Sequence, residues 1–547
     1  MEVFAQEKLL FTPAQPNQDA VGVVYAFPNT YSVGITSLGY QWLWAQLAQR
    51  EDVRVSRYFV DVQENVPAEV ELVGFSFSWE LDYGNILHML EEMEIPLSAR
   101  ERRAEHPLVF GGGAVLTANP EPFAEWFDVI LLGDGEELLE NLISAYKEVR
   151  GEQRSHQLRH LAQVAGIYVP SLYEVEYGEG IKKIEVMGAG VPPVVEKQTY
   201  RGKVLSSSTV VTPLAAWENI YMVEVVRSCP EMCRFCLASY VTLPFRSHAV
   251  MEGLIPAIDR GLQVTNRLGL LGASITQHPQ FSELLAWLDQ PKYDHVRLSL
   301  ASVRTNTLTV ELAKIMAKHD SRSVTVAIET GSPRLREVIN KKLTNEEIMQ
   351  AVVNAQGGGL QGIKFYGMVG VPTEEMTDID QTIALFKELK KVAPKLKLAF
   401  GCSTFVPKAH TPWQWMPVDP SSEKKLQYLQ KKLGGLGIEF RPEGYKDSLL
   451  QAVISRGDRR LSKVLLLAYE YAQGEGKTEP SLGMVKRAFK ELQKEVPPFD
   501  WYVFRRYGEE EILPWQHLRT AIKPETLLHH FHQSLNLESD KAGRMTA

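Results

Sequence analysis

The chain has 547 residues, enough for three or four domains at roughly 150 residues each, and it is 44% hydrophobic and 23% charged. These values are ordinary for a globular protein and exclude a largely disordered, collagen-like or disulfide-stapled chain. The 59 basic and 67 acidic residues give a net charge of −8, which excludes a strongly basic nucleic-acid-binding surface over the whole chain.

Residues 1–150 alternate between apolar strand-like runs and helix-like segments. The runs begin with VGVVYAFP at 21–28 and continue with VRVSRYFVD, VELVGFSFS, PLVFGGG and FDVILLGDG. Apolar strands separated by helices predict a doubly wound parallel sheet, which binds ligands at the carboxyl ends of its strands. The residues at those ends that could lie close to a flat ligand are Asn29, Ser76, Ser78, Gly111, Gly112 and Gly113.

Residues 151–217 show no sustained helical period and are predicted to be a linker with small β elements. Short strands are expected there at 167–169, 173–177 and 181–186.

Strand–helix alternation returns from 218 to 417, with strands expected to begin near 221, 267, 296, 323, 362 and 397. Six such units predict a partial (β/α)6 TIM-type barrel. Residues 418–547 carry charged helical patterns such as SLGMVKRAFKELQKEV and predict a helical C-terminal domain. In that segment Arg456, Arg459 and Arg460 could bind an anionic substrate, although charged helices are usually solvated faces.

Three of the four cysteines fall within eight residues, after the strand-like segment YMVEVVRS. Cys229, Cys233 and Cys236 form a C-x3-C-x2-C loop. Three thiolates at this spacing can hold three corners of an iron–sulfur cube and leave one iron open for a substrate or cofactor. Structural zinc needs four ligands, commonly from paired C-x2-C units, and no second pair occurs. The spacing favours the open cluster, with zinc and structural thiols as alternatives.

On these residues the chain resembles the radical S-adenosylmethionine enzymes. Their signature C-x3-C-x-aromatic-C follows the first strand of a partial (β/α)6 barrel, and Phe235 fills the aromatic place. LLGASITQHP stands where the family's Gly-Gly-Glu loop holds the methionine amino group, but the acidic residue is missing. AIETGSPRLREVINKKLT and YGMVGVPTE are similar to the fourth- and fifth-strand segments. The resemblance implies a [4Fe-4S] cluster on the three cysteines and S-adenosylmethionine held by Phe235, Gly272, Ala273, Ser274, Glu329, Ser332, Gly367, Gly370 and Pro372. Gly272 and Gly370 are expected at strand carboxyl ends, where close backbone approach to a nucleoside favours glycine.

The front domain resembles the cobalamin-binding domain of one subgroup of these enzymes, through its strand order, GGGA at 111–114 and FDVILLGDGEE at 127–137. The loop whose His ligates cobalt is replaced here by the segment from Phe27 to Gly34, and the first His of the chain is His88. The resemblance therefore implies a cobalamin site, at the six strand-end residues named above, in which cobalt has no protein His. A retained scaffold that docks substrate or covers the barrel is the alternative.

The resemblance implies an enzyme in which the reduced cluster cleaves S-adenosylmethionine and a 5′-deoxyadenosyl radical abstracts hydrogen from an unidentified substrate. Methyl transfer is one outcome that a cobalamin-type domain implies. An electron donor such as ferredoxin or flavodoxin is the implied partner, and nucleic acid is not expected. Cys402 is a weak candidate for a catalytic hydrogen-atom donor, because a small buried hydrophobe is the simpler interpretation.

Two other functions stay open. A methylthiotransferase acting on transfer RNA or a ribosomal protein would share the barrel, but that family carries a second three-cysteine cluster and residues 1–228 contain no Cys. The other is a non-catalytic iron–sulfur or zinc-binding interaction protein. The absence of an 18-residue apolar run and of a secretion signal, together with four cysteines, predicts a cytoplasmic protein with no membrane span.

Overall fold

The computed structural model describes residues 3–203, 205–301 and 303–545, with side chains of the last helix described to residue 535. The chain forms two compact units. The first, here called the sheet unit, comprises Met1–Gly202, Ser208–Asn219 and Leu450–Lys523, and the second, the barrel unit, comprises Lys203–Ser207, Ile220–Leu449 and Pro524–Ala547. Of these ranges, residues 1, 2, 204, 302, 546 and 547 lie outside the described residues.

This division differs from the four predicted segments. Most of the expected linker belongs to the sheet unit, and the expected C-terminal domain is shared between the two units. Helix α14 (Tyr445–Arg456) passes from one to the other. The reason is that helices after residue 450 have apolar faces that need a partner surface, and they find it on elements encoded far earlier in the chain.

The sheet unit contains the predicted doubly wound sheet. Its strand order is β3-β2-β4-β5-β6-β7, and all neighbours are parallel except β6 and β7. Counting only the parallel strands, this is the flavodoxin-like order 2-1-3-4-5. All seven residues of β2 are buried, because helices cover both faces. The strands are β2 (Val21–Phe27), β3 (Val53–Phe59), β4 (Leu72–Ser76), β5 (Leu108–Gly112), β6 (Val129–Leu131) and β7 (Ile167–Tyr168).

Helices and short strands complete this unit. The predicted strands in the middle segment are confirmed as β7, β8 and β9, but helix α6 was missed because its residues RSHQLRHL are largely polar and carry a weak period. The helices are α1 (Tyr31–Gly34), α2 (Leu38–Ala48), α3 (Tyr83–Glu92), α4 (Ala114–Ala118), α5 (Gly135–Glu148), α6 (Arg154–Leu161), α15 (Leu461–Gly474), α16 (Leu482–Glu491) and α17 (Phe499–Val503). The short strands are β1 (Lys8–Leu9) with β11 (Val210–Val211), β8 (Tyr173–Tyr177) with β9 (Ile181–Val186), and β10 (Val195–Glu196) with β21 (Leu518–Arg519).

The barrel unit contains the six predicted parallel strands and a seventh. Three strands pair as β12-β15-β16 and four as β17-β18-β19-β20, and an isolated parallel bridge between Val303 and Val326 connects the two groups. The seventh strand, β20, was not predicted because Glu439–Pro442 is short and mostly exposed. The strands are β12 (Ile220–Glu224), β15 (Arg267–Leu271), β16 (Arg297–Leu300), β17 (Ser323–Glu329), β18 (Gly362–Val369), β19 (Lys397–Thr404) and β20 (Glu439–Pro442).

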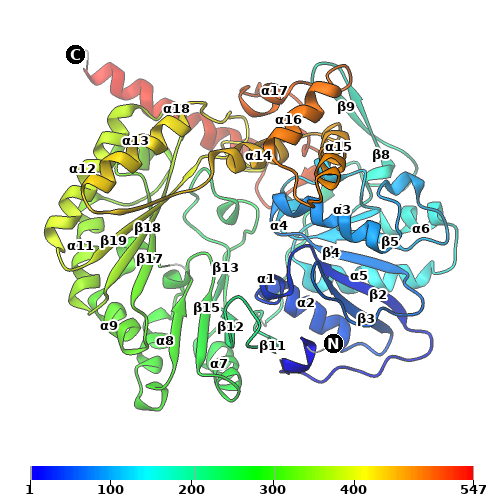
Figure 1. Ribbon diagram of the computed structural model, residues 1–547, viewed down its shortest axis with the longest axis horizontal. Helices are drawn as coiled ribbons and strands as arrows, with labels where there is room; N and C mark the ends of the chain where they lie inside the picture. Colours follow the sequence, from blue (N-terminus) through cyan, green and yellow to red (C-terminus); the bar gives the residue numbers. More distant parts are fainter. Residues whose placement is uncertain (1–2, 204, 302, 546–547) are drawn as a thin grey trace. The chain divides into compact units, whose positions relative to one another are not determined.

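The apolar core of the barrel unit lies between the strands and the helices on their outer side (Figure 1). Phe365 of β18 and Phe400 of β19 are buried there against Phe386 of α12. Ile379 and Phe386 lie on the buried face of that helix. The helices are α7 (Ile255–Leu262), α8 (Phe281–Leu288), α9 (Val310–Lys318), α10 (Pro333–Val338), α11 (Asn345–Gly357), α12 (Met376–Val392), α13 (Ser422–Gly435) and α18 (Pro524–Met545).

Cys402 belongs to this core. It is 1% exposed, and its thiol lies on the same outer side of β19 as Phe400. Burial raises its pKa well above the ordinary thiol value. A buried thiol on the helix-covered side of the sheet is a packing group, which supports the simpler interpretation of Cys402 as a small buried hydrophobe.

The arginines at 456, 459 and 460 are structural. Arg456 is 1% exposed and donates to the carbonyls of Val503 and Arg505. Arg459 forms a buried ion pair with Glu121 at 3.0 Å, and Arg460 pairs with Asp458 at 2.7 Å. These guanidinium groups are used within the sheet unit, so they form neither an anion site nor a solvated face.

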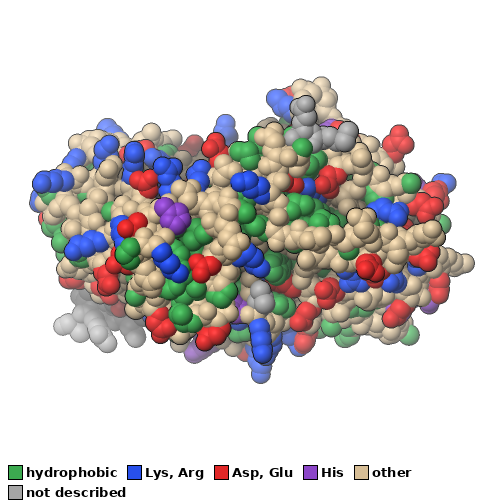
Figure 2. All heavy atoms as spheres, turned by 90° about the horizontal axis from the view of Figure 1, so that it is seen from below, with side chains coloured by type: hydrophobic (Ala, Val, Ile, Leu, Met, Phe, Trp, Pro, Cys, Tyr) green, Lys and Arg blue, Asp and Glu red, His purple; other side chains and the backbone are tan. Residues whose placement is uncertain are grey.

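No helix in the described part of the chain is both long and apolar enough to cross a membrane. Figure 2 shows basic and acidic side chains interspersed over the face that it draws.

Candidate functional site

The three clustered cysteines lie on a loop that the backbone closes tightly. The loop follows β13 (Val226–Arg227). This strand pairs with β14 (Arg246–Ser247), which comes after the cysteines in the sequence. The amide of Cys229 donates to the carbonyl of Ala238 at 3.1 Å, and the Cys236 amide donates to the Cys233 carbonyl at 3.0 Å. Ser228 and Met232 adopt left-handed φ values of 74° and 57°, which turn the chain around Cys229. The loop thus presents three thiols from eight consecutive residues.

Residues after helix α10 hold this loop from one side. The side-chain amide of Asn340 donates to the carbonyl of Met232 at 2.8 Å and to that of Glu231 at 3.3 Å. The Cys233 thiol lies 3.8 Å from the Asn340 carbonyl. Asn340 has a φ of 57°, a conformation that Asn tolerates better than most side chains. Asn340 therefore connects the fourth strand–helix unit to the cysteine loop.

Arg234, inside the loop, joins it to two helices. Its guanidinium donates to the carbonyls of Val338 at 2.7 Å and Glu337 at 3.0 Å, and so caps the carboxyl end of α10. Its Nε donates to the carbonyl of His530 in α18 at 3.0 Å. The hydroxyl oxygen of Tyr240, just beyond the loop, lies 3.0 Å from Nδ1 of the same histidine. The last helix of the chain is therefore packed against the cysteine loop.

Replacing Arg234 by methionine is expected to loosen the loop. The change removes the guanidinium donor of three carbonyl oxygens; the Glu337 carbonyl keeps the Asn340 amide as a donor, whereas the bond to the Val338 carbonyl is buried. A buried group left unpaired costs about 1–3 kcal/mol. Reconstituted R234M should lose iron to a chelator at least several-fold faster than wild type under anaerobic conditions. R234K keeps the positive charge but lacks the planar guanidinium group, so it should retain more iron than R234M and less than wild type.

The matched control for this test is R441M, because Arg441 is an exposed arginine of the same unit, paired with the exposed Glu439. Equal iron release from R234M and R441M would contradict the positioning role of Arg234.

The thiols are held in a low-polarity setting beside one cation. Burial raises the pKa of Cys233 to about 12, while the nearby Lys341 acts in the opposite direction. Burial also raises the pKa of Cys236. Lys341 is paired with Glu329 at 2.9 Å, and this pair outweighs the effect of burial, so that the pKa of Lys341 is raised. Without metal these two thiols are therefore protonated near neutral pH, and metal binding must displace their protons.

Glu329 stands at the carboxyl end of β17 in a strained conformation. It has a φ of 65°, directly after a register shift between Ala327 and Glu329. Its partner in β18 is Gly367, where a Cβ would lie 2.4 Å from the Glu329 carbonyl oxygen. Left-handed backbone at a non-glycine residue costs energy, and it is typical of functional sites.

The second-strand loop also reaches the cysteine loop. Gly272 follows β15 with a φ of 150°, and a Cβ there would lie 2.6 Å from the Val226 carbonyl oxygen. Ser274 is 4% exposed; its hydroxyl donates to Gln277, whose amide donates to Glu231. Gly272 is thus at a strand end as predicted, but the close approach that requires glycine is to β13.

Two further predicted residues serve packing. Ser332 is fully buried, donates to Asp378 at 2.6 Å and caps α10, so its burial does not support a contact with ribose or carboxylate groups. Gly370 ends β18 with a φ of 76°, and a Cβ there would lie 2.1 Å from Ser422 Oγ. Packing against α13, and not a nucleoside, accounts for this glycine. Pro372 is half-buried in the loop after β18.

The structure therefore brings together the cysteine loop, the Gly272–Ser274 loop and the Glu329–Lys341 pair. Phe235 is half-buried in the cysteine loop and Ala273 is exposed in the second-strand loop. The sequence analysis missed Arg234, Asn340 and Lys341, although they stand inside segments that it singled out.

The donor set fits an iron–sulfur cube better than zinc. Within residues 3–203, 205–301 and 303–545, no three His, Cys, Asp or Glu side chains converge closely enough to hold a single metal ion. A cube places each thiolate on a different iron, so its ligands stand farther apart than the ligands of one ion. Three thiolates match the three protein-ligated corners of an open cube, whereas closed zinc requires four ligands.

Several of the predicted cobalamin-binding residues of the sheet unit are engaged in hydrogen bonds or close packing. Asn29 donates to Asp82 at 3.0 Å and accepts from the Thr30 amide at 2.8 Å, and burial raises the pKa of Asp82 to about 7. A Cβ at Gly113 would lie 2.4 Å from the Phe77 carbonyl oxygen, and one at Gly111 would lie 2.6 Å from the side chains of Leu116 and Phe127. Gly112 has more room, Ser76 is half-buried and Ser78 is exposed. The loop after β2 does not fit as a source of a cobalt ligand, and cobalamin binding stays a prediction.

Two family models match the chain. Residues 54–170 match the description "Radical SAM proteins, N-terminal", and residues 223–386 match "Radical SAM superfamily". The second match begins within β12 and spans the cysteine loop, the second-strand loop and Glu329.

Curated relatives extend the similarity over most of the chain. An uncharacterized protein of Methanocaldococcus jannaschii is 27% identical over 447 residues, which cover 81% of this chain and 90% of that protein. An uncharacterized methyltransferase of Pyrococcus horikoshii is 34% identical over 89 residues, 16% of this chain and 19% of that protein.

Solved structures show weaker similarity. The cobalamin-dependent S-adenosylmethionine radical enzyme OxsB, with aqua-cobalamin and S-adenosylmethionine bound, matches 96% of this chain and 80% of its own at 12% identity and a TM-score of 0.45. Coproporphyrinogen III oxidase from Escherichia coli matches 40% of this chain and 52% of its own at 12% identity and a TM-score of 0.26. Likenesses this low decide nothing about the chemistry of this chain.

Proposed function

This chain belongs to the radical S-adenosylmethionine superfamily, and on that premise we propose that its cysteine loop holds one [4Fe-4S] cluster with which the enzyme cleaves S-adenosylmethionine reductively. The observation that carries the proposal is the closed loop of Cys229, Cys233 and Cys236, positioned by Arg234 and Asn340. Three protein thiolates leave one iron of a cube open, which is where a cofactor can bind.

When bound, the cluster and S-adenosylmethionine supply an electron and a 5′-deoxyadenosyl radical that abstracts a hydrogen atom from the substrate. The chain's own contribution is binding and orientation. Lys341 places a positive charge near Cys233, which favours the thiolate form that a metal requires. Glu329 forms an ion pair with that lysine and so holds its ammonium group at the end of β17.

The second-strand loop is proposed to hold the methionine part of the cofactor. The exposed Ala273 lies between Gly272 and Ser274, in the loop after β15 that approaches β13. The Ser274–Gln277–Glu231 chain of hydrogen bonds joins the two loops and keeps them in register. We propose that backbone groups of this loop take the place of the missing acidic residue.

Anaerobic reconstitution tests the proposal. Wild-type protein is expected to take up about four irons per chain and, with dithionite, to convert S-adenosylmethionine into 5′-deoxyadenosine and methionine. Iron content, visible absorption and chromatography of the products measure the result. Stoichiometric zinc without iron uptake would contradict the cluster, and a stable cluster without cleavage would favour the non-catalytic interaction protein.

The partner and location follow as parts of the same proposal. A small electron carrier such as ferredoxin or flavodoxin is proposed to reduce the cluster, and the cytoplasm is proposed as the compartment because it keeps thiols reduced. No methyl-transfer step through cobalamin follows from the sheet unit, since its loop after β2 presents no nitrogen ligand for cobalt.

A further inference from the structure

The outer helices of the barrel unit carry a local excess of lysine. Residues 387–437 contain ten lysines and three acidic residues, Glu388, Asp419 and Glu423, although the whole chain has a net charge of −8. The segment comprises the end of α12, all of β19 and all of α13. Helices α11, α12 and α13 lie side by side on the outside of the unit (Figure 1). Nucleic acid was not expected from the charge of the whole chain, but that average conceals the local excess.

Most of these lysines are exposed, and the exposed ones are here called the lysine face: Lys387, Lys390, Lys391, Lys395, Lys397, Lys424, Lys431 and Lys432. In the described part of the chain, five of their side chains have no hydrogen-bond or ion-pair partner: Lys387, Lys395, Lys397, Lys424 and Lys431. Lys391 pairs with Glu388 at 2.7 Å, but both side chains are more than half exposed, so the pair stabilises little. Most of the positive charge on these helices is therefore uncompensated.

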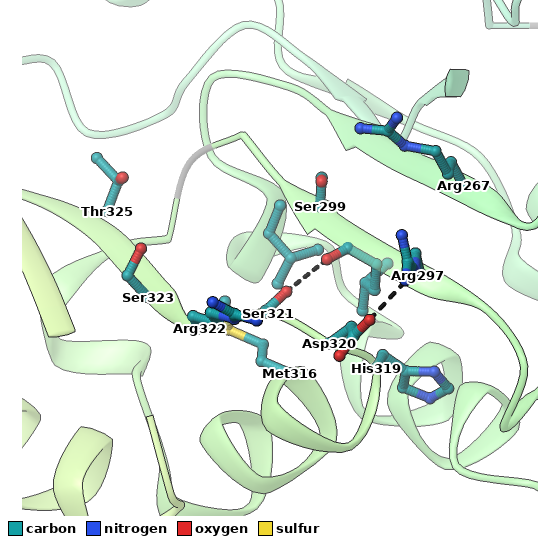
Figure 3. A pocket seen from close by; sticks show the side chains of 12 residues that line it. Arg267, Arg297, Ser299, Met316, His319, Asp320, Ser321, Arg322, Ser323 and Thr325 are labelled. Atoms are coloured by element: carbon teal, nitrogen blue, oxygen red, sulfur yellow. Dashed lines mark hydrogen bonds and ion pairs between the residues drawn. The ribbon is translucent and has the colours of Figure 1, made fainter. Parts of the chain in front are cut away.

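The lysine face continues along the amino ends of the barrel strands. The turn from α12 into β19 carries four lysines within eight residues, Lys390, Lys391, Lys395 and Lys397. The Lys397 amide donates to the Gln361 carbonyl at 3.0 Å, and the Gln361 amide donates to the Arg322 carbonyl at 2.8 Å. Arg322 is exposed directly before β17, in the pocket that Figure 3 draws. Since neighbouring strands are about 4.8 Å apart, Arg322 and Lys397 extend the row of charges by roughly 10 Å.

A cavity of about 650 Å³ opens beside the lysine face, where α10, α11 and α12 meet. Lys387 is part of its wall. Its lining combines apolar side chains with two amides, and includes Met349, Ala384, Leu385, Asn345 and Gln381. Apolar walls with a few polar groups suit a flat ring with polar edges, such as a nucleobase. Lys387 and Lys391 stand one helical turn apart, so a phosphate chain that leaves the cavity meets successive ammonium groups.

The composition of the lysine face favours a nucleic acid over an acidic protein. Protein–protein interfaces are enriched in aromatic residues and depleted in lysine, whereas phosphate backbones are neutralised by lysine and arginine. Among the described residues of 387–437, Val392 is the one large hydrophobic side chain that is strongly exposed. The cavity favours RNA, because specific RNA recognition uses unstacked bases of single strands and amide groups can reach the 2′-hydroxyl.

We infer that the lysine face binds RNA, with phosphates on the lysines and one unstacked base in the cavity beside Lys387. All the groups involved belong to the barrel unit. None of them lies in the cysteine loop, so the inference does not depend on the proposed radical function.

Fluorescence anisotropy with a labelled single-stranded RNA of mixed sequence, about 20 nucleotides long, tests the inference on the full-length protein. Wild type should bind, and the logarithm of its binding constant should fall with the logarithm of the KCl concentration by about 0.7 per phosphate contact. K387Q/K391Q/K395Q should weaken binding about tenfold or more and reduce that slope by about 2, because three contacts are lost. A384W fills the cavity from an exposed position and should weaken binding about tenfold with an unchanged slope, because base stacking is lost and charge is not.

The matched control is K486Q/K490Q/K494Q, which removes three exposed lysines with the same spacing from α16 and the residues after it. It should bind RNA as wild type does, and thermal melting shows whether each variant is folded. Wild type without RNA affinity, or equal losses in the two folded triple variants, would overturn the inference. Single-stranded DNA of the same sequence or polyglutamate that binds as tightly as the RNA would also overturn it. Unchanged RNA affinity in folded A384W would overturn the entry of a base into the cavity.

Discussion

Alanine in place of any one of Cys229, Cys233 or Cys236 is expected to leave the protein without its cluster and without cleavage of S-adenosylmethionine. The cube already has one iron without a protein ligand, so loss of one of the three thiolates leaves only two corners attached. Iron should fall from about four per chain to near none. Iron analysis, visible absorption and electron paramagnetic resonance of the reduced protein measure this loss.

Cys402→Ala is the matched control, because it removes the remaining thiol of the chain. Cys402 packs in the outer core of the barrel unit, so its loss should cost on the order of 1 kcal/mol of stability and leave the iron content unchanged. A cluster that survives in one of the three loop variants, or disappears in C402A, would show that the ligand set is different.

Arg459→Met is expected to destabilise the sheet unit by about 3–5 kcal/mol, the cost of leaving one member of a buried ion pair alone. Arg459 donates to Glu121 at 3.0 and 3.2 Å, to the Tyr173 carbonyl at 2.7 Å and to the Tyr168 hydroxyl at 2.6 Å. Glu121 is 2% exposed, so its charge would remain in the interior with only the Tyr168 hydroxyl and His517 beside it. Urea unfolding at neutral pH measures the difference.

The pH dependence of this effect separates the ion pair from simple packing. Burial opposes the charge on Glu121, but Arg459 and His517 outweigh it and lower its pKa from 4.5 to about 2. A carboxyl with a lowered pKa stabilises the folded state fully above its unfolded value of 4.5 and loses that contribution as pH falls toward 2. The gap between wild type and R459M should therefore narrow over this range.

Arg100→Met is the control, because Arg100 is an exposed arginine of the same unit, paired with Glu125 at 3.2 Å. Its change should cost at most about 1 kcal/mol. A loss in R459M no larger than in R100M would mean that the Glu121–Arg459 pair contributes little.

The order of elements and the three cysteines could be predicted from the sequence, because both depend on local patterns. Continuous apolar runs such as Val21–Phe27 can only be strands covered on both faces, and the alternation with helices then requires parallel sheets. The spacing of Cys229, Cys233 and Cys236 likewise limits which metal groups they can hold. The short, exposed strand β20 and the polar helix α6 were not predicted, because their patterns of apolar residues are weak.

Only the tertiary structure decided which residues support the cysteine loop and which are merely packed. The sequence alone determined the alternating strands, the two parallel sheets and the three thiols of one loop. It could not show that α18, encoded about 300 residues later, packs against Arg234, because such contacts depend on shape and carry no periodicity along the chain. For the same reason it placed Ser332 and Gly370 at the reaction site, whereas hydrogen bonding and burial assign them to a helix cap and a close contact with α13. Cys402, a weak catalytic candidate from the sequence, lies in the apolar core.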